Sequence, residues 1–410
     1  MTLRRTWFGT GRSVLTVLTA FTALAGTTVV GAAPADAAQG TTVAPGVVYR
    51  QYDIQGARGV ARAHVLSVDL RRRARLGLLR PGAVARRATI SGLADAQGAV
   101  AGVNGDFFNI TEIQHPGVRA TGAAVGPAIA SGRVLKAAVP DGQRFGPDLP
   151  PGTDATEVVG VGSDWRARLD RLRLDGSVRT PTGTLPLGGL NQYALPVGSI
   201  GAFTSDWGTA SRVRATCGTD TERAASCSAD TYEVTLRHGR VVALADRPGS
   251  GAVAPGTTVL VGREAGARQL RRFFRGEPVS VRHRLVASGS RIPFRFALGG
   301  YPVLRGGVPL AGLNNRTSAV RTAVGIASGG RRVLLLALDG APAYRSGLTI
   351  AEVAGVLRSL GAVDGFSLDG GGSSTLVARA PGASRVSVRN HPSGGAERAV
   401  ANGIGVFTVG

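Results

Sequence analysis

Lysine is almost missing from this chain of 410 residues. Of its 48 basic residues 47 are arginine, and Lys136 is the single lysine. Such arginine usage is typical of a GC-rich bacterial genome. The formal net charge of +22 favours polyanionic neighbours. However, the arginines are scattered, and the densest run, Arg71 to Arg73, has no interleaved aromatic side chains. We therefore do not expect nucleic-acid binding.

Histidine and cysteine are also scarce, with five and two residues respectively. The histidines show no zinc-binding spacing, and the chain has no Gly-x-Ser-x-Gly elbow, no Walker loop and no Rossmann fingerprint followed by a helix. Triad hydrolysis and nucleotide chemistry thus lack support. Cys217 and Cys227 lie in a polar stretch without Cys-x-x-Cys spacing, so we expect a structural disulfide formed in an oxidising compartment.

Long apolar runs are rare, and the clearest one is at the N-terminus. Val14 to Val30 is rich in Ala, Leu, Val and Thr; it follows Arg4, Arg5 and Arg12 and precedes Ala35-Asp36-Ala37. A membrane anchor is the competing interpretation, but the threonines and the Ala-x-Ala pattern favour a cleaved signal peptide. We expect residues 1–37 to be this signal peptide. The mature protein would then be secreted, extracellular and without a stable membrane anchor, with a charge near +20 after the loss of three Arg and one Asp.

The remaining chain predicts an α+β fold with a β-rich mixed sheet core and a few packed helices. We expect a linker at 38–46 and one domain at 47–410, with insertions near 142–156 and 216–230. Val65 to Leu70 alternates as a half-buried strand does. Thr89 or Ser91 can cap a short helix that runs through Gln97, and another helix is expected around 265–274.

The C-terminal third predicts a strand–helix–strand unit. A buried strand, 333–338, ends at Asp339-Gly340, and Thr349 to Glu352 forms a capping box that starts a helix ending at Gly361. A second apolar strand follows and ends at Asp369. If the two strands are parallel, their carboxyl ends lie at the same edge of the sheet.

Three apolar strands end in an acid or amide beside glycine. They lead into Asn104-Gly105-Asp106, into Asp339-Gly340 and into the run Asp369-Gly370-Gly371-Gly372-Ser373-Ser374. Glycine permits close backbone approach and leaves N–H groups accessible, so the last run could hold a sugar, a phosphate or a cation. Converging carboxylates could perform acid/base chemistry or bind a divalent cation. The alternative is that each Asp-Gly pair is an ordinary turn.

Six segments occur in an order that resembles the phosphodiester glycosidase family. They are Ala101–Asn109, Arg321–Gly325, Leu338–Gly340, Gly347–Glu352, Leu368–Thr375 and Glu397–Asn402. The resemblance spans about residues 65–409. It implies hydrolysis of a sugar-1-phosphodiester, such as a GlcNAc-1-phosphodiester, at the glycosidic carbon, with release of the free sugar and a phosphomonoester.

The resemblance also implies roles for residues of these segments. Asp369 and Asp339 are the candidate acid/base pair, and Asp106 with Asn104 would orient sugar hydroxyls or water. Arg321 would bind the phosphodiester. The remaining substrate-binding candidates are Gly370, Gly371, Gly372, Ser373 and Ser374. No cofactor is implied with certainty, although a divalent cation is possible.

The chain departs from the family pattern at two positions. Ala341 stands where an Arg or Gln often follows Asp-Gly, and Gly394 stands where the family often carries an acid. The departure at Gly394 and the high charge leave an alternative open: an exported, non-catalytic binder of cell-wall glycan or of a phosphate-bearing polymer. The expected partners are accordingly a carbohydrate or phosphodiester-linked glycan substrate, with an anionic cell-wall polymer as a further candidate.

Overall fold

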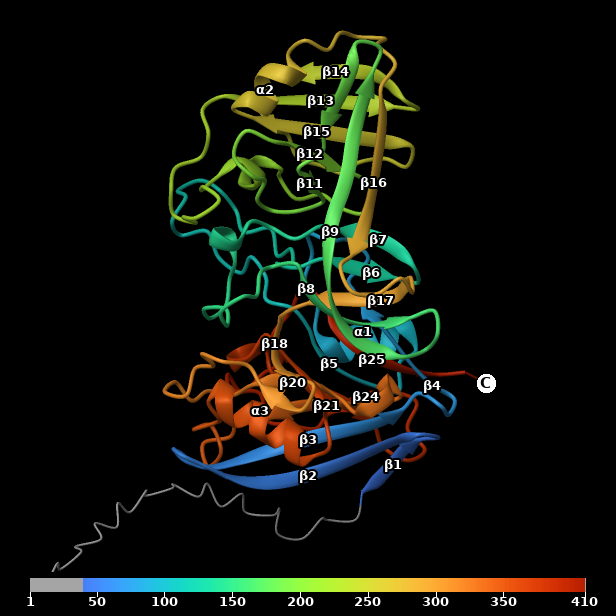
Figure 1. The fold of residues 1–410 in the computed structure, drawn as a ribbon, viewed down its shortest axis with the longest axis vertical. Coiled ribbons are helices and arrows are strands. Elements are labelled where there is room, and N and C mark those ends of the chain that lie inside the picture. Colours follow the sequence, from blue (N-terminus) through green and yellow to red (C-terminus); the bar gives the residue numbers. More distant parts are fainter. Residues whose placement is uncertain (1–39, 410) are drawn as a thin grey trace, which may run out of the picture. The chain divides into compact units, whose positions relative to one another are not determined.

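Strands dominate the computed structural model, which describes residues 40–409 (Figure 1). Strands make up 41% and helices 10% of the described residues, which confirms the β-rich α+β prediction. The predicted signal peptide lies outside the described residues. Among those that are described, no helix is long and apolar enough to cross a membrane.

An eight-stranded sheet, here called the central sheet, carries the C-terminal motifs. Its strands in spatial order are β1 (Thr41–Ala44), β2 (Val47–Gly56), β3 (Gly59–Asp69), β21 (Arg332–Leu338), β20 (Thr322–Ile326), β22 (Asp364–Leu368), β18 (Tyr301–Arg305) and β19 (Val308–Pro309). Every neighbouring pair in this sheet is antiparallel. Since β20 lies antiparallel between β21 and β22, those two strands are parallel to each other, as the sequence analysis required.

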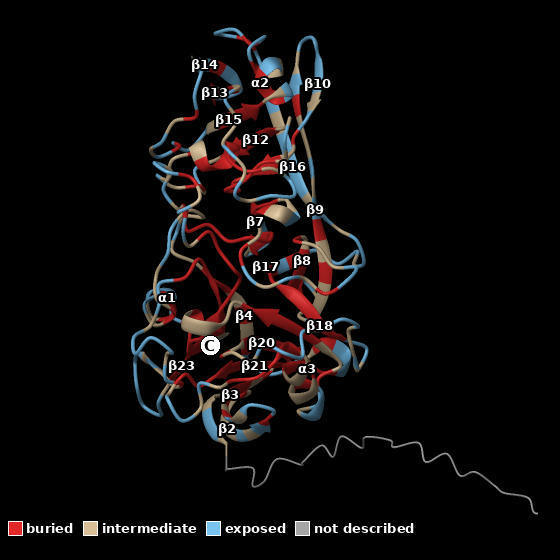
Figure 2. Cartoon of the chain, turned by 90° about the vertical axis from the view of Figure 1, so that its left-hand side faces the viewer, coloured by how far each residue is buried: buried red, intermediate tan, exposed pale blue. Residues whose placement is uncertain are grey.

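Both faces of the central sheet are covered around its inner strands β21, β20, β22 and β18, which are largely buried (Figure 2). Leu334, Leu336 and Leu338 pack with α3 (Ile350–Ser359), whereas Val333 and Leu335 face a second sheet. This two-sided burial explains why the sequence of β21 is apolar without alternation. The second sheet has the order β24 (Val386–Val388), β23 (Leu376–Arg379), β5 (Ala101–Asn104), β25 (Gly403–Thr408) and β4 (Ala74–Leu79).

Two further sheets are built mainly from the middle of the chain. One has the order β10 (Gly183–Pro186), β9 (Ala167–Thr180), β8 (Glu157–Gly162), β17 (Phe294–Gly299), β6 (Ala128–Ala130) and β7 (Arg133–Lys136), with β16 (Ser280–Ala287) paired to β9. The other has the order β11 (Gly189–Leu190), β12 (Ile200–Phe203), β15 (Thr257–Arg263), β13 (Thr231–Arg237) and β14 (Arg240–Ala245). In this last sheet β11 and β12 are parallel.

The three predicted helices are present. Thr89 caps α1 (Ile90–Gln97) by accepting from the Gly92 N–H, and α2 (Ala265–Leu270) is shorter than the predicted 265–274. Thr349 and Glu352 form the predicted capping box of α3. The short 3-10 helices are η1 (Asp141–Gln143), η2 (Val213–Thr216), η3 (Ser328–Gly330) and η4 (Gly371–Ser373).

The predicted linker 38–46 needs a correction. Its residues 41–44 form β1, an edge strand paired with β2. The run Thr-Thr-Val favours extended backbone because these residues are β-branched, yet it is too short and too exposed to give an apolar pattern. The predicted disulfide between Cys217 and Cys227 is present.

Candidate active site

The carboxyl ends of β21 and β22 lie on either side of the first residue of β20. Thr322 pairs with Ala337 on one side and with Leu368 on the other. Asp339 and Asp369 directly follow these strands, so they leave the central sheet at the same edge. Because two strand spacings separate β21 from β22, the two aspartates leave the sheet roughly 10 Å apart.

Asn104 ties this edge to the second sheet. Its Nδ2 donates to the Asp369 carbonyl (2.6 Å), and its Oδ1 accepts from Thr322 Oγ1 (2.8 Å) and from the Thr375 N–H (3.0 Å). The Asp369 N–H in turn donates to the Gly105 carbonyl (2.9 Å). Asn104 is fully buried, so these contacts make it a structural connector that fixes Asp369 next to the segment ending in Asp106.

Asp369 is half-buried at the start of the glycine run. Its Oδ1 accepts from the Gly370 N–H (3.0 Å). Burial raises the pKa of Asp369 to about 6, and the nearby charge of Asp106 acts in the same direction. Ser373, the Gly370 amide and the Arg398 guanidinium oppose this rise. A carboxyl with such a pKa exchanges protons near neutral pH, which suits acid/base chemistry.

The glycines of the run 370–372 allow close packing of the backbone, and they do not leave a row of N–H groups free for a ligand. A Cβ on Gly370 would lie 2.7 Å from the Val320 carbonyl oxygen, and one on Gly372 would collide with Arg398. The Gly371 N–H donates to the Val320 carbonyl (2.7 Å), and Gly371 adopts a left-handed φ of 58°. The expectation of accessible amides is therefore wrong for Gly370 and Gly371, because Asp369 and Val320 already accept their protons.

The two serines of the run point inward. Ser374 Oγ lies 3.1 Å from Thr322 Oγ1, whose own proton goes to Asn104, and Ser373 Oγ accepts from Arg398 Nη1 (3.4 Å). Both serines are fully buried. The structure thus adds Arg398 to the surroundings of Asp369. The segment Glu397–Asn402 was part of the resemblance, but nothing in the sequence assigned this arginine a partner.

Asp339 has different surroundings from Asp369. Its Oδ1 accepts from the Ala341 N–H (2.8 Å), and its Oδ2 accepts from the His391 N–H (3.1 Å) and contacts His64 Nε2 (2.9 Å). Burial would raise the pKa of Asp339, but the two amides and His64 hold it below its ordinary value. His64 Nδ1 lies 2.7 Å from the Tyr49 hydroxyl. Asp339 is therefore an ionised anchor.

The segment 390–393 joins the two strand ends. The Gly340 N–H donates to the His391 carbonyl (2.7 Å), and Ser393 Oγ donates to the Gly371 carbonyl (3.3 Å). Asn390 Nδ2 reaches the Ser374 carbonyl (2.9 Å). Gly394, where the family often has an acid, directly follows this segment and is exposed.

Asp106 lies behind Asp369, where β5 ends. Only 1% of Asp106 is exposed; its Oδ2 accepts from the Gly126 N–H (2.6 Å), and its own N–H donates to Asn402 Oδ1 (2.9 Å). Within residues 40–409, Asp106 Oδ1 is buried without a hydrogen-bond partner. Burial raises the pKa of Asp106 to about 6, although Lys136, the Gly126 amide and Arg144 oppose the rise.

Arg321 lines a cavity of about 610 Å³ beside this edge. Its Nε donates to the Leu348 carbonyl (3.2 Å) and its Nη2 to the Thr317 carbonyl (2.8 Å). A Cβ on Gly370 would lie 3.6 Å from the Arg321 Cα, so the arginine packs directly against the glycine run. The volume suits a ligand of sugar-phosphate size.

Tyr301 connects the cavity with Asp369. It lines the cavity, is buried, and has a pKa raised by burial, with Arg321 and Asp369 among the nearby charges. Ser367 lies close enough to lower this pKa, yet the Tyr301 hydroxyl makes no hydrogen bond of good geometry within the described part of the chain. Sequence analysis missed Tyr301, since a lone tyrosine after Gly299-Gly300 carries no signal.

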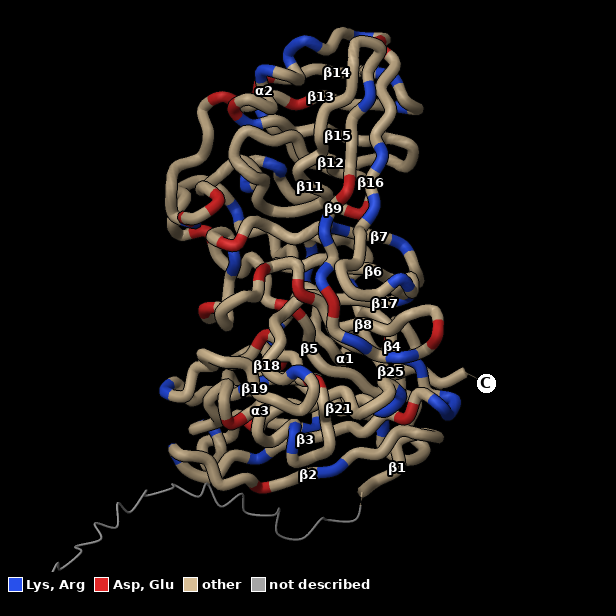
Figure 3. Tube along the Cα trace, viewed as in Figure 1, with Lys and Arg blue, Asp and Glu red and all other residues tan. Residues whose placement is uncertain are grey.

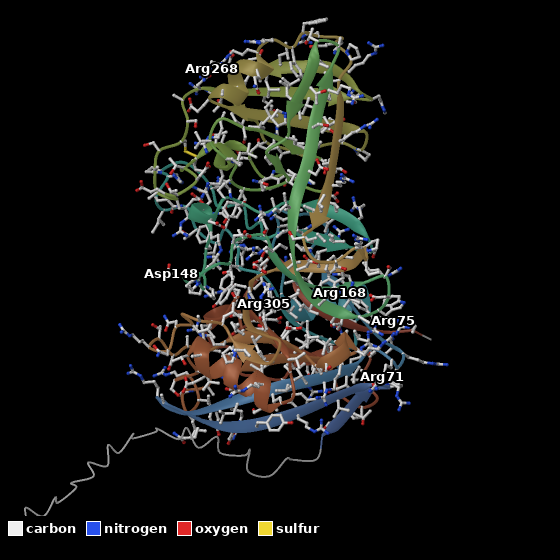
Figure 4. The ribbon with its side chains drawn as sticks, viewed as in Figure 1. Arg71, Arg75, Asp148, Arg168, Arg268 and Arg305 are labelled. Atoms are coloured by element: carbon white, nitrogen blue, oxygen red, sulfur yellow. A yellow bond between two sulfur atoms is a disulfide. The ribbon has the colours of Figure 1, made fainter. Side chains whose placement is uncertain are left out.

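Two loops complete the cavity. The first, within the predicted insertion 142–156, includes Asp148, labelled in Figure 4; the second lies between β19 and β20. The lining residues are Gly146, Pro147, Asp148, Leu149, Pro150, Tyr301, Gly312, Leu313, Asn314, Asn315, Arg316, Thr317, Ala319, Arg321 and Ile350.

The carboxylates do not form a metal centre. Over residues 40–409, no group of three or more His, Cys, Asp or Glu side chains is placed to hold a metal ion. The donors around Asp369 and Asp339 are N–H groups and a histidine ring rather than further carboxylates. The residues present therefore do not fit the divalent cation that the sequence left open.

Comparison with solved structures shows the same fold in two bacterial proteins. A hypothetical protein from Synechocystis has 18% identity and a TM-score of 0.67; the alignment covers 89% of this chain and 62% of that one. A presumed exported protein from Burkholderia pseudomallei K96243 has 24% identity and a TM-score of 0.65, over 85% of this chain and 74% of that one. This chain thus spans about three fifths of the Synechocystis protein.

A third structure is the catalytic domain of zebrafish N-acetylglucosamine-1-phosphodiester alpha-N-acetylglucosaminidase, auto-inhibited by its pro-peptide. It has 15% identity and a TM-score of 0.45, over 91% of this chain and 87% of that one. Comparison with curated proteins gave no match. Residues 221–407 match the family model of the phosphodiester glycosidases. This match confirms, over residues 221–407, the resemblance that the motifs predicted.

Proposed function

We propose that this protein is an exported hydrolase that cleaves sugar-1-phosphodiesters, of which a GlcNAc-1-phosphodiester is the model substrate, to the free sugar and a phosphomonoester. The family match supports a glycosidase-type activity. The observation that carries the proposal is Asp369, a half-buried carboxyl with a pKa of about 6 beside a cavity that contains a fixed arginine.

Arg321 is the proposed phosphate ligand. Two of its nitrogens donate to the carbonyls of Leu348 and Thr317, and these contacts hold the guanidinium plane in place. Among the described residues no hydrogen bond uses its Nη1, so this nitrogen can donate to a phosphate oxygen. A guanidinium held in this way loses little side-chain entropy when it binds an anion.

Asp369 is the proposed base. A phosphomonoester is a stable leaving anion, with a second pKa near 6, so its departure needs little protonation and activation of water matters more. In the proposed step the water oxygen attacks the anomeric carbon while Asp369 takes the water proton. The bond from that carbon to the bridging oxygen breaks, and its electron pair stays on the phosphate. Above about pH 6 Asp369 is ionised and ready for this role.

Asp339 then holds the site together rather than reacting. Both of its oxygens accept from N–H groups, and its contacts fix the segment 390–393 against the glycine run. Of the predicted acid/base pair, the proposal keeps Asp369 as the reacting group. It makes Asp339 a fixed negative charge.

Export is part of the proposal. The N-terminal segment has the pattern of a signal peptide, and the disulfide between Cys217 and Cys227 is compatible with an extracellular location. The Burkholderia protein with the same fold is itself described as a presumed exported protein.

The test is hydrolysis of methyl GlcNAc-1-phosphate in water enriched in oxygen-18. We expect free GlcNAc that carries the label at its anomeric oxygen and methyl phosphate that carries none, as read by mass spectrometry. Label in the methyl phosphate would show cleavage at phosphorus and contradict a glycosidase. Tight binding of the diester without product would instead support the alternative, a non-catalytic glycan binder.

A further inference from the structure

The only lysine of the chain is buried in the protein interior. Lys136 ends β7 and is 1% exposed, although arginine supplies every other basic side chain. An amine is expensive to bury unless it is fully hydrogen-bonded. Its Nζ donates to the carbonyls of Val125 (3.2 Å), Ala137 (2.6 Å) and Gly126. All three protons are thus used by backbone carbonyls.

The backbone held by Lys136 also holds Asp106. Gly126, whose carbonyl accepts from Lys136, donates its N–H to Asp106 Oδ2 (2.6 Å). From the other side, a Cβ on Gly299 would lie 2.6 Å from the same Oδ2. The Asp106 carboxylate therefore packs closely between Gly126 and Gly299. Its position depends on where Lys136 places the Val125–Gly126 backbone.

Asp106 is in turn linked to Asp369. The Asp369 N–H donates to the carbonyl of Gly105, the residue before Asp106, and the charge of Asp106 raises the pKa of Asp369. The other groups that act on Asp369 are Arg398, Ser373 and Tyr301, whereas Arg144 and Tyr193 lie near Asp106.

We propose that Lys136 is a positioning residue that holds the Asp106 carboxyl in place behind Asp369 and favours its charged form, and thereby shifts the proton equilibrium of the proposed reacting carboxyl. The inference rests on the proposed role of Asp369. An arginine at position 136 would not serve, since its planar, longer head cannot direct three donors to carbonyls grouped around one nitrogen. This explains why the chain retains one lysine.

The burial of Asp106 determines the direction in which the pKa of Asp369 changes when Lys136 is removed. Without the Lys136 charge, only Arg144 and the Gly126 and Phe107 amides oppose the effect of burial on Asp106, and its pKa rises above about 6. Asp106 is then neutral where Asp369 titrates, so Asp369 loses a neighbouring negative charge and its pKa falls. Removing the Asp106 charge directly has the same consequence.

The test uses carbon-13 NMR of the aspartate carboxyl carbons in the full protein, with the signal of Asp369 assigned by its loss in Asp369→Asn. We expect the titration midpoint of Asp369 to fall by roughly 0.5 pH unit or more in Lys136→Met and in Asp106→Asn. In the double variant the midpoint should equal that of Asp106→Asn alone. Lys136→Arg, which keeps the charge, should shift Asp369 less than Lys136→Met.

Two results would overturn the proposal. One is an Asp369 midpoint that is unchanged in folded Lys136→Met and Asp106→Asn. The other is a Lys136→Met shift that persists in the Asp106→Asn background, since Lys136 would then act without Asp106. If Lys136→Met alone does not fold, the double variant removes the unpaired buried charge and provides the comparison with Asp106→Asn. The titration needs no substrate, so its outcome is independent of the hydrolysis assay.

Discussion

The three aspartates that follow apolar strands look alike in the sequence, yet their surroundings differ. Asp339 accepts from N–H groups at both oxygens and is held ionised. Asp106 is buried and Asp369 half-buried, each has fewer donors, and the pKa of each is raised to about 6. The number of hydrogen-bond donors near each carboxylate, rather than the Asp-Gly pattern, therefore separates an anchor from a group that can exchange protons.

Asp369 should reduce stability at neutral pH. Its folded pKa of about 6 exceeds the ordinary value of 3.8, so its contribution to stability is full below about pH 4 and is lost as the pH rises through 6. We therefore expect Asp369→Asn to raise the free energy of unfolding at pH 7.5, relative to wild type, by roughly 1–2 kcal/mol. At pH 4 the gain should be near zero. Urea titrations at pH 7.5 and pH 4 measure the two changes in the free energy of unfolding. An equal change at the two pH values would contradict the raised pKa of Asp369.

Arg321 should govern substrate affinity. Loss of a charged hydrogen bond typically costs 1.5–3 kcal/mol, so we expect Arg321→Gln to raise KM by roughly 10- to 100-fold. Arg316 lines the same cavity but is exposed, which makes Arg316→Gln the matched control, with a smaller expected change. Steady-state kinetics on the phosphodiester compares them. Equal effects of the two variants would point to general attraction by charge instead of a specific contact.

At the scale of elements, the C-terminal unit was predictable because its signals are local. The apolar run of β21, the capping box of α3 and the glycine after the helix each depend on neighbouring residues. The order of strands was not predictable, since β20 enters between β21 and β22 from an earlier part of the chain. The partners of Lys136, Tyr301 and Arg398 could not be predicted either, because each of these contacts joins segments that are distant in the sequence.

The capping box of α3 should contribute measurably to stability. Thr349 accepts from the Glu352 N–H, while Glu352 accepts from Thr349 N–H (2.7 Å) and from Ala57 N–H (2.7 Å). Thr349→Ala should lower the free energy of unfolding by about 1 kcal/mol. Glu352→Ala should cost more, because it also frees the turn between β2 and β3.

Chemical denaturation measures these losses. Ser359→Ala, at an exposed position near the end of the same helix, is the control and should change stability by less than about 0.5 kcal/mol. If Glu352→Ala lowers the free energy of unfolding by no more than Thr349→Ala does, the contact between Glu352 and Ala57 does not contribute to stability.

At the scale of the whole molecule, the net charge of +22 gives a field that attracts anions. Basic residues occur along β9 and β16 (Figure 3). Arg179 and Arg282 are exposed diagonal neighbours on these strands, and no ion pair involving either is found within residues 40–409. We propose this face as a contact for an anionic polymer such as those of a bacterial cell wall.

The salt dependence of polyphosphate binding tests this contact. Binding should weaken steeply between low and physiological ionic strength, since exposed charges are screened over about 8–10 Å. The double variant Arg179→Gln/Arg282→Gln should bind more weakly than wild type, with hydrolysis of a small phosphodiester unchanged. Binding that is insensitive to both salt and this double change would contradict the proposal.

The most direct test of the proposed function is the turnover of methyl GlcNAc-1-phosphate by wild type and by Asp369→Asn at pH 7. We predict that wild type releases GlcNAc and that Asp369→Asn lowers kcat/KM by roughly 10²- to 10⁴-fold while thermal unfolding shows an intact fold. Asp246→Asn, which changes an exposed aspartate, should match wild type. Full turnover by folded Asp369→Asn would contradict the account.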